Sequence, residues 1–289
     1  MLKKIIVFLF LTAHSFTNAQ LTDLARVEYS FIPKTKSEDQ YTRLRALFNY
    51  PIKVKEDSYF VVGIEYNRII LNLRDTYPFD ISFLNSITVL DLNLAYTHKM
   101  NENWRVAYRI TPRLASTLTN KITKDDFFLN GGVFFIKDRT KATDLTPYRL
   151  ILGLTYNTTA GIPFPLPLIS YFRQFNEKWS YTVGVPKMNL KYRFNNKNNV
   201  QAFLGLDGYF AHIQQGKMVQ GQQVDNISLS VGVAGFGYEY AFTKNLVWYA
   251  YSGYTFRLNN ILRNENRDDV FALDDINSFY LRSGIKFRI

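Results

Sequence analysis

The stretch Ser278–Ile289 alternates between apolar and polar side chains. One parity carries Phe279, Leu281, Ile285, Phe287 and Ile289, and the other carries Tyr280, Arg282, Gly284, Lys286 and Arg288. A period of two is typical of a β-strand with two different faces. A soluble protein gains nothing from an exposed apolar strand at its end. In a membrane barrel, however, the last strand pairs with the first and its apolar face meets lipid. The stretch therefore predicts an all-β chain that folds as a transmembrane β-barrel.

The N-terminus has the features of a secretory signal peptide. Lys3 and Lys4 precede the apolar run Ile5–Leu11, and Thr17-Asn18-Ala19 has small residues before a cut after Ala19. The rival interpretation is a membrane anchor, but the run is too short to span a bilayer. We therefore expect residues 1–19 to be removed on export and residues 20–289 to form one outer-membrane barrel domain.

The composition agrees with a barrel. Aromatic residues make up 16% of the chain, cysteine is absent, and the expected mature part has no run approaching ~18 apolar residues. The runner-up fold is a soluble secreted β-sandwich, which would need a second sheet to cover its apolar face. The formal net charge of +11 does not point to nucleic acid, because the chain is exported and has no nucleic-acid-binding motif.

The alternating segments predict an antiparallel up-and-down barrel. In order, the expected strands are Leu24–Phe31, Tyr41–Val54, Tyr59–Arg68, Ser86–His98, Trp104–Ser116, Asp126–Lys137, Tyr148–Asn157, Leu168–Phe175, Trp179–Val185, Asn189–Phe194, Val200–Phe210, Asn226–Phe242, Leu246–Arg257 and Ser278–Ile289. Pro186 separates two short segments, which as one strand would reduce the count to 13. A count of 12 follows if two segments fold inward. Single-chain bacterial barrels have even numbers of strands, so within the range of 12–14 strands we favour 14, with both termini periplasmic.

Two local features predict irregularities in the barrel. The segment Ile162–Leu168 contains three prolines, which cannot donate to a strand ladder, so we expect a stiff loop. Its Ile, Phe and Leu side chains predict that the loop packs against the barrel mouth or into it. In Asn226–Phe242 the apolar parity switches near Gly235 and Gly237, which predicts a β-bulge there.

A repeated turn sequence leads into each tryptophan. The three stretches are Met100–Trp104, Phe175–Trp179 and Phe242–Trp248, and each opens an upward strand after a short polar turn. Short turns belong to the periplasmic side of outer-membrane barrels, and Trp is enriched at membrane interfaces. We therefore expect an interfacial aromatic belt of Trp104, Trp179 and Trp248.

The polar faces of the strands are rich in basic residues. The candidates for lining the lumen are Arg43, Arg45, Arg105, Arg109, Arg113, Arg149, Arg282 and Lys286. One interpretation is a pore that favours anions. The other is an interior filled by charge pairs with Glu28, Glu65, Asp91, Asp207 and Glu239. Since the bases outnumber these acids, we lean towards a positive lumen.

Neither catalysis nor a metal site is indicated. The chain lacks the motifs of common hydrolases and nucleotide-binding enzymes, and the expected mature part retains only His98 and His212. We therefore expect no enzyme and no cofactor. Asp268, Asp269, Asp274 and Asp275 offer the oxygen ligands that calcium prefers, but without the ligand spacing of an EF-hand. A solvated acidic loop is favoured over a calcium site.

The whole expected mature chain resembles uncharacterised outer-membrane β-barrel families of Gram-negative bacteria. The residues that carry the resemblance are Asn18-Ala19-Gln20, the turn–Trp repeats, Asp126-Phe-Phe-Leu-Asn-Gly-Gly132 and the closing strand. The resemblance implies an outer-membrane location, contact with outer-membrane lipids, and recognition of Phe279–Ile289 by the barrel-assembly machinery. It brings no ligand and no oligomeric state. We predict a passive channel for small, anionic solutes; the alternative is a plugged structural or surface-binding barrel.

Overall fold

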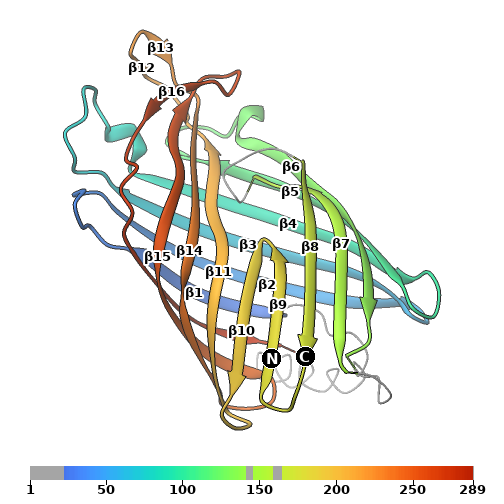
Figure 1. Ribbon diagram of the computed structural model, residues 1–289. Coiled ribbons are helices and arrows are strands. Elements are labelled where there is room, and N and C mark those ends of the chain that lie inside the picture. Colours follow the sequence, from blue (N-terminus) through green and yellow to red (C-terminus); the bar gives the residue numbers. More distant parts are fainter. Residues whose placement is uncertain (1–22, 141–145, 159–164, 289) are drawn as a thin grey trace, which may run out of the picture.

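The structure, a computed structural model, describes residues 23–140, 146–158 and 165–288 (Figure 1). Within these residues, fourteen antiparallel strands form a closed barrel, which confirms the predicted fold class and the favoured strand count. They are β1 (Ala25–Ile32), β2 (Gln40–Lys55), β3 (Ser58–Asn72), β4 (Ser86–Lys99), β5 (Arg105–Ser116), β6 (Phe127–Asp138), β7 (Tyr148–Tyr156), β8 (Pro165–Gln174), β9 (Trp179–Val185), β10 (Lys187–Arg193), β11 (Asn198–His212), β14 (Asn226–Ala241), β15 (Leu246–Arg263) and β17 (Phe279–Phe287). The first and last strands close the ring, with Val27 opposite Ile285.

The two ends of the barrel differ. At the turn end, short connections such as residues 56–57, 100–104, 175–178, 194–197 and 242–245 join the strands. At the loop end, longer connections carry the short elements η2 (Ser82–Leu84), η3 (Lys124–Asp126), β12 (Met218–Val219), β13 (Gln222–Gln223) and β16 (Asp269–Ala272). Figure 1 shows β12, β13 and β16 gathered above one side of the barrel.

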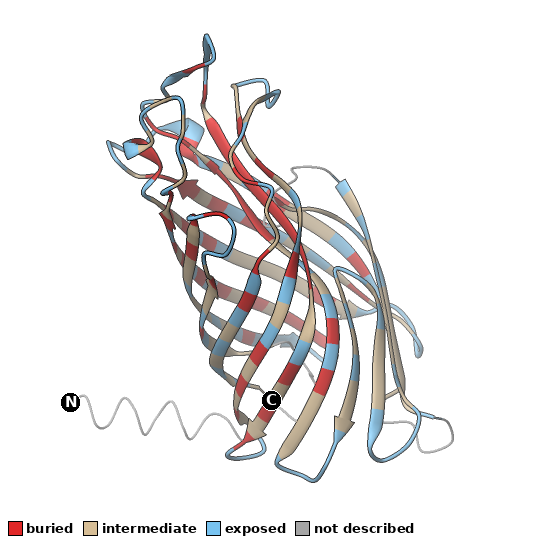
Figure 2. Ribbon diagram, turned by 60° about the vertical axis from the view of Figure 1, so that its left-hand side comes forward, coloured by how far each residue is buried: buried red, intermediate tan, exposed pale blue. Residues whose placement is uncertain are grey.

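The outer surface is apolar on every barrel strand. One representative per strand, each between 44% and 75% exposed, is Val27, Phe48, Ile64, Leu92, Ile110, Leu129, Leu154, Ile169, Val183, Leu190, Leu204, Phe236, Phe256 and Ile285. Figure 2 shows exposed and buried positions alternating along the strands, with buried positions concentrated where the loops gather. Among the described residues, there is no helix with the length and apolarity needed to cross a bilayer.

Four connections at the turn end are built in the same way. Asn101, Asn176 and Asn195 each accept hydrogen bonds at Oδ1 from the backbone N–H groups two and three residues later. Thr243 accepts the equivalent pair at Oγ1. Such side chains stabilise a turn by replacing a backbone acceptor. The repeat noticed around the tryptophans is thus a turn motif, and its fourth copy, Phe194–Asn198, contains no Trp.

The segment around the three prolines differs from the expected loop. Residues 162–164 lie outside the described residues, as does the predicted packing of that part against the mouth. Pro165–Leu168, however, belong to β8, where Pro167 pairs with Leu154 and Pro165 with Tyr156 of β7. The expectation of a loop up to Leu168 was wrong because this part of β8 has no partner in β9: the last β8–β9 pair is Ile169 with Val185. A strand edge accepts proline because no ladder bond is lost.

The predicted bulge near Gly235 and Gly237 is also displaced. The register between β14 and β15 shifts at Ser230 and Val231 instead. The parity argument failed because residues 226–233 are all buried, so this part of β14 has no polar, exposed face against which to read the alternation.

The barrel is pinched at the loop end. The upper end of β11 leaves its neighbour β10 and reaches β5, where His212 pairs with Ser116 in parallel. The Thr117 N–H donates to the His212 carbonyl at 3.1 Å. Strands β6 to β10 are therefore bypassed at this level, and the remaining strands enclose a narrower ring.

Candidate functional site: the barrel interior

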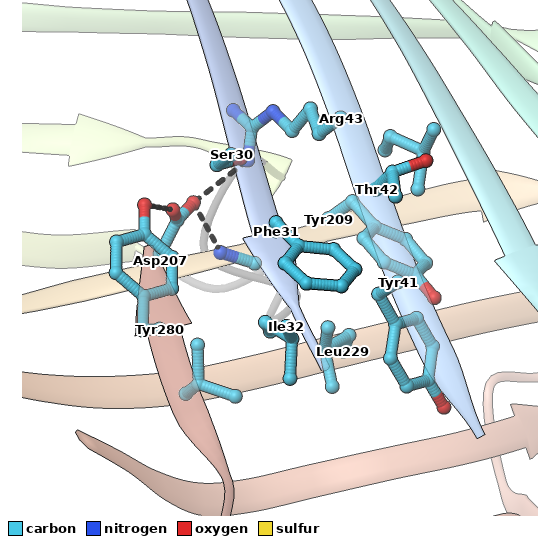
Figure 3. Close-up of a pocket in the computed structure, with 13 residues that line it drawn as sticks. Ser30, Phe31, Ile32, Tyr41, Thr42, Arg43, Asp207, Tyr209, Leu229 and Tyr280 are labelled. Carbon is cyan, nitrogen blue, oxygen red and sulfur yellow. Dashed lines mark hydrogen bonds and ion pairs between the residues drawn. The ribbon is translucent and has the colours of Figure 1, made fainter. Parts of the chain in front are cut away.

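The first part of the interior is a set of ion pairs that crosses from β2 to β11. Arg43 Nη1 lies 2.7 Å from Asp207 Oδ1, and Arg45 Nη2 donates to Glu65 Oε2 at 2.8 Å. Arg45 also lies 3.5 Å from Glu28. Figure 3 shows Arg43 and Asp207 joined, with Tyr280 on the other oxygen of Asp207. Because β2 and β11 are not neighbours in the sheet, this pairing ties opposite walls together across the interior.

A second set is organised around Glu239 on β14. Lys191 and Lys286 each place Nζ at 2.8 Å from one of its carboxylate oxygens. The hydroxyl of Tyr251 donates to the same carboxylate at 3.1 Å and accepts from Gln201 at 2.8 Å. Glu239 is only 2% exposed, so two lysines and a phenol together satisfy a buried charge.

A third set lies on β4, β5 and the chain after β7. Arg113 binds Asp91 in a bidentate manner, with Nε to Oδ1 at 2.7 Å and Nη2 to Oδ2 at 2.6 Å. The Arg113 Nη1 also donates to Thr158 Oγ1 at 2.9 Å. Thr158 donates its N–H to the Asn130 side chain, which fixes the end of β7 beside β6.

The other predicted lumen bases also face inward. Arg149 pairs with Asp138 at 2.7 Å, and Arg105 donates to the Asp57 carbonyl at 2.8 Å near the turn end. Arg109 lies over the ring of Phe134 at 5.4 Å, and Arg282 over Tyr251 at 4.9 Å. Neither Arg109 nor Arg282 has a carboxylate oxygen within 4.0 Å in the described part of the chain.

All five acids that the sequence offered as partners take part in these ion pairs. These five acids are therefore all compensated, and the excess of positive charge remains on bases that have no carboxylate partner in the described chain, such as Arg109 and Arg282. The sequence interpretation also missed Lys187, which faces the interior above the rings of Phe203 and Tyr251 at 5.7 and 5.2 Å. It was missed because the strand was expected to begin at Asn189. The sequence feature that could have revealed Lys187 is its spacing of four residues from Lys191, which places both side chains on the same face of the strand.

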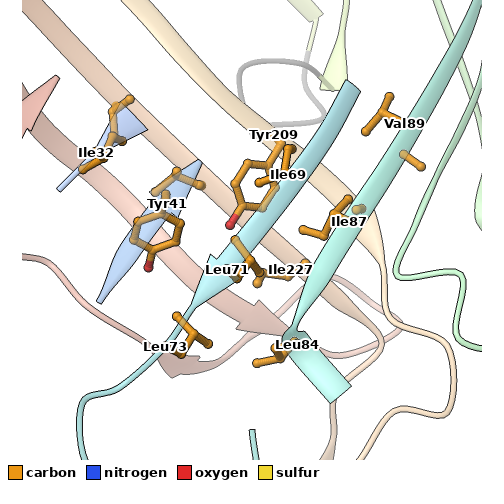
Figure 4. Close-up of a cluster of buried hydrophobic side chains, with 14 of the residues drawn as sticks. Ile32, Tyr41, Ile69, Leu71, Leu73, Leu84, Ile87, Val89, Tyr209 and Ile227 are labelled. Carbon is orange, nitrogen blue, oxygen red and sulfur yellow. The ribbon is translucent and has the colours of Figure 1, made fainter. Parts of the chain in front are cut away.

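A hydrophobic cluster fills the interior at the loop end (Figure 4). It includes Ile32, Tyr41, Ile69, Leu71, Leu73, Leu84, Ile87, Val89, Tyr209 and Ile227. Loop residues complete it, because Tyr77, Phe79 and Phe271 stack edge-to-face or tilted at 5.0–6.3 Å and pack against the cluster. Side chains from β1 to β4, β11 and β14 thus occupy the narrower ring that the contact between β11 and β5 creates.

A small cavity separates the ion pairs from this cluster. It has a volume of about 40 Å³ and is lined by residues such as Arg43, Asp207, Tyr209 and Tyr280 (Figure 3). One water needs roughly 10–15 Å³ on this measure, so the cavity holds a few waters at most. This side of the barrel therefore provides no wide passage along its axis.

The opposite side of the interior is different. On β6, β7 and β8 the inward residues are mostly apolar, and we call Phe134, Ile136, Ile151, Leu166, Leu168 and Phe172 the inner strip. Cross-strand pairing places them on one face, since Phe134 opposes Gly153 and Gly153 opposes Leu168. All except Phe134 are half-buried rather than buried, so they remain accessible from inside the barrel. The interior is therefore filled on one side and partly open on the other.

The three tryptophans lie near the turn end. Trp104 precedes β5, Trp179 is the first residue of β9, and Trp248 is the third of β15. Trp179 lies 4.7 Å from Tyr192, and Trp248 6.0 Å from Tyr238, so other aromatic rings extend the row. Their position at a membrane interface stays a prediction.

The four acidic residues proposed as a weak calcium site are spread over the loop end. Asp269 pairs with Arg263, Asp274 lies 3.4 Å from Arg257, and Asp268 accepts from Asn264 at 3.1 Å. Asp275 is exposed. Burial raises the pKa of Asp274 above its ordinary value. Among the described residues, no group of three or more acids, histidines or cysteines comes together to hold a metal.

A sequence profile described as Domain of unknown function (DUF6268) matches residues 18–288. The chain belongs to this family. No curated protein sequence matches it. The structure is similar to the COG4313 outer membrane channel from Pseudomonas putida F1, with 10% identity, 96% of this chain and 100% of that chain covered, and a TM-score of 0.44. It is also similar to the Pseudomonas putida toluene transporter TodX (11%, 93% and 90%, 0.38) and to LpxR from Salmonella typhimurium (10%, 92% and 99%, 0.39). Similarities of this size carry no information on what this DUF6268 barrel binds or passes.

The two histidines of the described chain are placed differently. His98 lies between the rings of Tyr96 and Tyr108 at 5.4 and 6.2 Å. His212 lies beside Ser116 and Asp126 at the loop end, but the Ser116 hydroxyl bonds to Asp126. Burial acts to raise the pKa of Asp126, but hydrogen bonds from Ser116, Thr123 and Gln214 hold it below its ordinary value. Ser116 is fully buried, and its hydroxyl hydrogen is directed to the Asp126 carboxylate rather than to His212.

Proposed function

We propose that the protein is an integral outer-membrane β-barrel with its turn end in the periplasm. The support is the apolar outer surface on all fourteen strands, which would meet lipid, and the row of aromatic residues at the turn end. On this proposal residues 1–19 are the export signal, and the strand that begins at Phe279 is the segment that the barrel-assembly machinery binds.

We further propose that the barrel passes small solutes passively along the inner strip. The observation that carries this is the asymmetry of the interior: ion pairs and the hydrophobic cluster fill one side, while the side formed by β6 to β8 keeps half-buried inward residues. A path of this kind is narrow, because fourteen strands enclose less space than the 16–18-stranded porins. Among ions, we expect anions to pass more readily, since Arg109, Lys187 and Arg282 lack nearby carboxylates in the described chain.

The alternative is a plugged barrel that serves a structural or surface-binding role. The hydrophobic cluster supports it, because packed side chains close the loop end of the narrower ring. The two proposals make opposite predictions about permeation.

Liposome swelling and planar-bilayer recording with folded, purified protein test the proposal. We expect swelling with small sugars and small conductance steps. Ser170→Trp on the inward face of β8 should reduce both, whereas the matched control Ser252→Trp, on the outer face of β15, should not. Absence of swelling and of conductance from protein that migrates as a folded barrel would favour the plugged alternative.

A further inference from the structure

The barrel wall is interrupted above the tip of the hairpin formed by β9 and β10. The hairpin turns at Pro186, where Val185 pairs with Ile169 on one side and Lys187 with Gly205 on the other. Both neighbours continue beyond it. Strand β8 extends upward to Pro165, and β11 extends to His212, as Figure 1 shows. Within the described residues, β8 has no strand partner on this edge beyond Ile169, and β11 has none between its hydrogen bond to Pro186 and its contact with β5 at His212.

The two strand edges that border the interruption leave few backbone N–H groups in need of a strand partner. The Gln174 N–H donates towards β7, so alternate residues, including Pro165 and Pro167, direct their backbone nitrogens towards the missing neighbour. Proline has no N–H to leave unpaired there. On β11, the Leu206 N–H donates to the Pro186 carbonyl at 3.0 Å, and the Gly208 N–H donates to the Asp207 side chain at 2.8 Å. These edges need fewer strand partners than ordinary edges do, which suits a permanent opening.

The course of β11 connects this interruption with the inner strip. Phe210 lies on the outward parity of β11, yet it is fully buried and packs edge-to-face against Phe128 at 5.5 Å. Phe128 opposes Arg113 and so belongs to the inward face of β6. At this level the outer face of β11 therefore faces the inner face of β6. The Arg267 guanidinium lies over the Phe210 ring at 5.6 Å and donates to the Tyr156 hydroxyl of β7 at 3.3 Å, so it bridges β11 and β7 at the top of the interruption.

The inner strip beside and below the interruption is apolar. The inner strip contributes Leu166 and Leu168 beside the interruption, and Ile136, Ile151 and Phe172 below it. The charged groups next to the strip lie on its β5 side, where Arg109 covers the Phe134 ring and Arg113 is paired with Asp91. Most of this wall offers no hydrogen-bond or ionic partner, so an ionised solute would lose hydration along it, whereas an apolar solute would not. We propose that the interruption is a lateral exit through which uncharged, apolar small molecules pass between the inner strip and the membrane. The proposal rests on the proposed function for its direction of use, but the exit itself can be tested separately.

Because the chain has no cysteine, single cysteines can report on the exit. Bimane would be attached to Leu168→Cys (inward, beside the interruption), Ile151→Cys (inward, lower) and Ile169→Cys (outward), in bilayers containing lipids with brominated acyl chains. Heat-modifiable migration verifies that each variant is folded. We expect strong quenching at residue 169, intermediate quenching at residue 168 and little at residue 151. Equal quenching at residues 168 and 151 would overturn the lateral exit.

A second measurement addresses the cargo. In intact Gram-negative host cells, expression should speed the entry of the uncharged apolar dye N-phenylnaphthylamine, and Leu168→Lys should remove most of that gain. An unchanged dye rate with lipid quenching at residue 168 would overturn the apolar cargo but not the exit. If the liposomes did not swell, but residue 168 was quenched by lipid and dye entry was faster, the proposed passage of hydrophilic solutes would be refuted and the lateral exit would stand.

Discussion

The buried pair of Arg113 and Asp91 allows a sharp test of how the interior is stabilised. Both side chains are 5% exposed, and two hydrogen bonds of 2.6 and 2.7 Å join them. Removing one partner leaves the other charge buried without compensation, which typically costs about 3–5 kcal/mol. Replacing both by apolar residues of similar size is often neutral or stabilising. We therefore expect Arg113→Met to be strongly destabilising and Arg113→Met with Asp91→Leu to recover most of the loss.

Urea unfolding of the folded barrel in detergent, followed by tryptophan fluorescence and gel migration, measures the effect. With a slope on the order of 3 kcal/mol per molar urea, a loss of about 4 kcal/mol lowers the midpoint by roughly 1.3 M. The Thr158 hydroxyl adds to the loss in the Arg113 variants, because it also accepts a hydrogen bond from Arg113. Thr158→Val alone should cost only about 1 kcal/mol, the value of one ordinary hydrogen bond.

The reasoning would be refuted if the single and double variants unfolded at the same urea concentration. That result would mean that Asp91 is hydrated or protonated in the folded barrel, and that the interior on this side is wetter than the structure indicates.

Three further predictions concern other parts of the barrel. Gly237→Ala should lower the free energy of unfolding by about 1–3 kcal/mol, because a Cβ there would lie 2.2 Å from the Tyr251 ring. Gln201 and Glu239 hold that ring in place by hydrogen bonds. Gly232→Ala is the matched control, since the atoms nearest to its Cβ would be 3.8 Å away. The pKa of Asp126 is held below its ordinary value of 3.8, so its ionised form stabilises the fold above pH 3.8. This stabilisation should be lost as the pH falls through the lowered pKa. Thermal unfolding measured against pH should therefore depend less on acid in Asp126→Asn than in the unaltered protein. Arg109→Glu should shift the reversal potential in a salt gradient towards cations, and cation preference in the unaltered protein would contradict a positive lumen.

Much of the architecture follows from local patterns that the sequence displays openly. The alternation in β17 has a period that only a strand can use, and the adjacent segments on either side of Pro186 form a hairpin because proline stops the ladder. The turn motif is equally local, since Asn101 and Asn176 bond to backbone groups within three residues. These features need no knowledge of which strand lies across the barrel.

The pairing of the interior could not be derived in this way. Parity indicates that Arg43 and Asp207 face inward, but 164 residues separate them, and their contact depends on the tilt of β11 towards β5. The same tilt creates the narrower ring that the hydrophobic cluster fills. A count of inward bases and acids therefore suggested a charge excess, whereas the distances determine which of those charges are compensated.

The inner strip nevertheless leaves a signal in the sequence, and it lies in the strands that obey the barrel pattern least well. In β7 the run Leu150-Ile-Leu-Gly-Leu154 is apolar on both parities, and in β6 aromatic residues occupy both faces at Phe134 and Phe135. A strand of a water-filled pore should alternate apolar-out and polar-in. Where both faces are apolar, one meets lipid and the other must meet something else that avoids water. In this barrel the inward apolar face is only half-buried by protein, so the remaining contact area is available to an apolar solute.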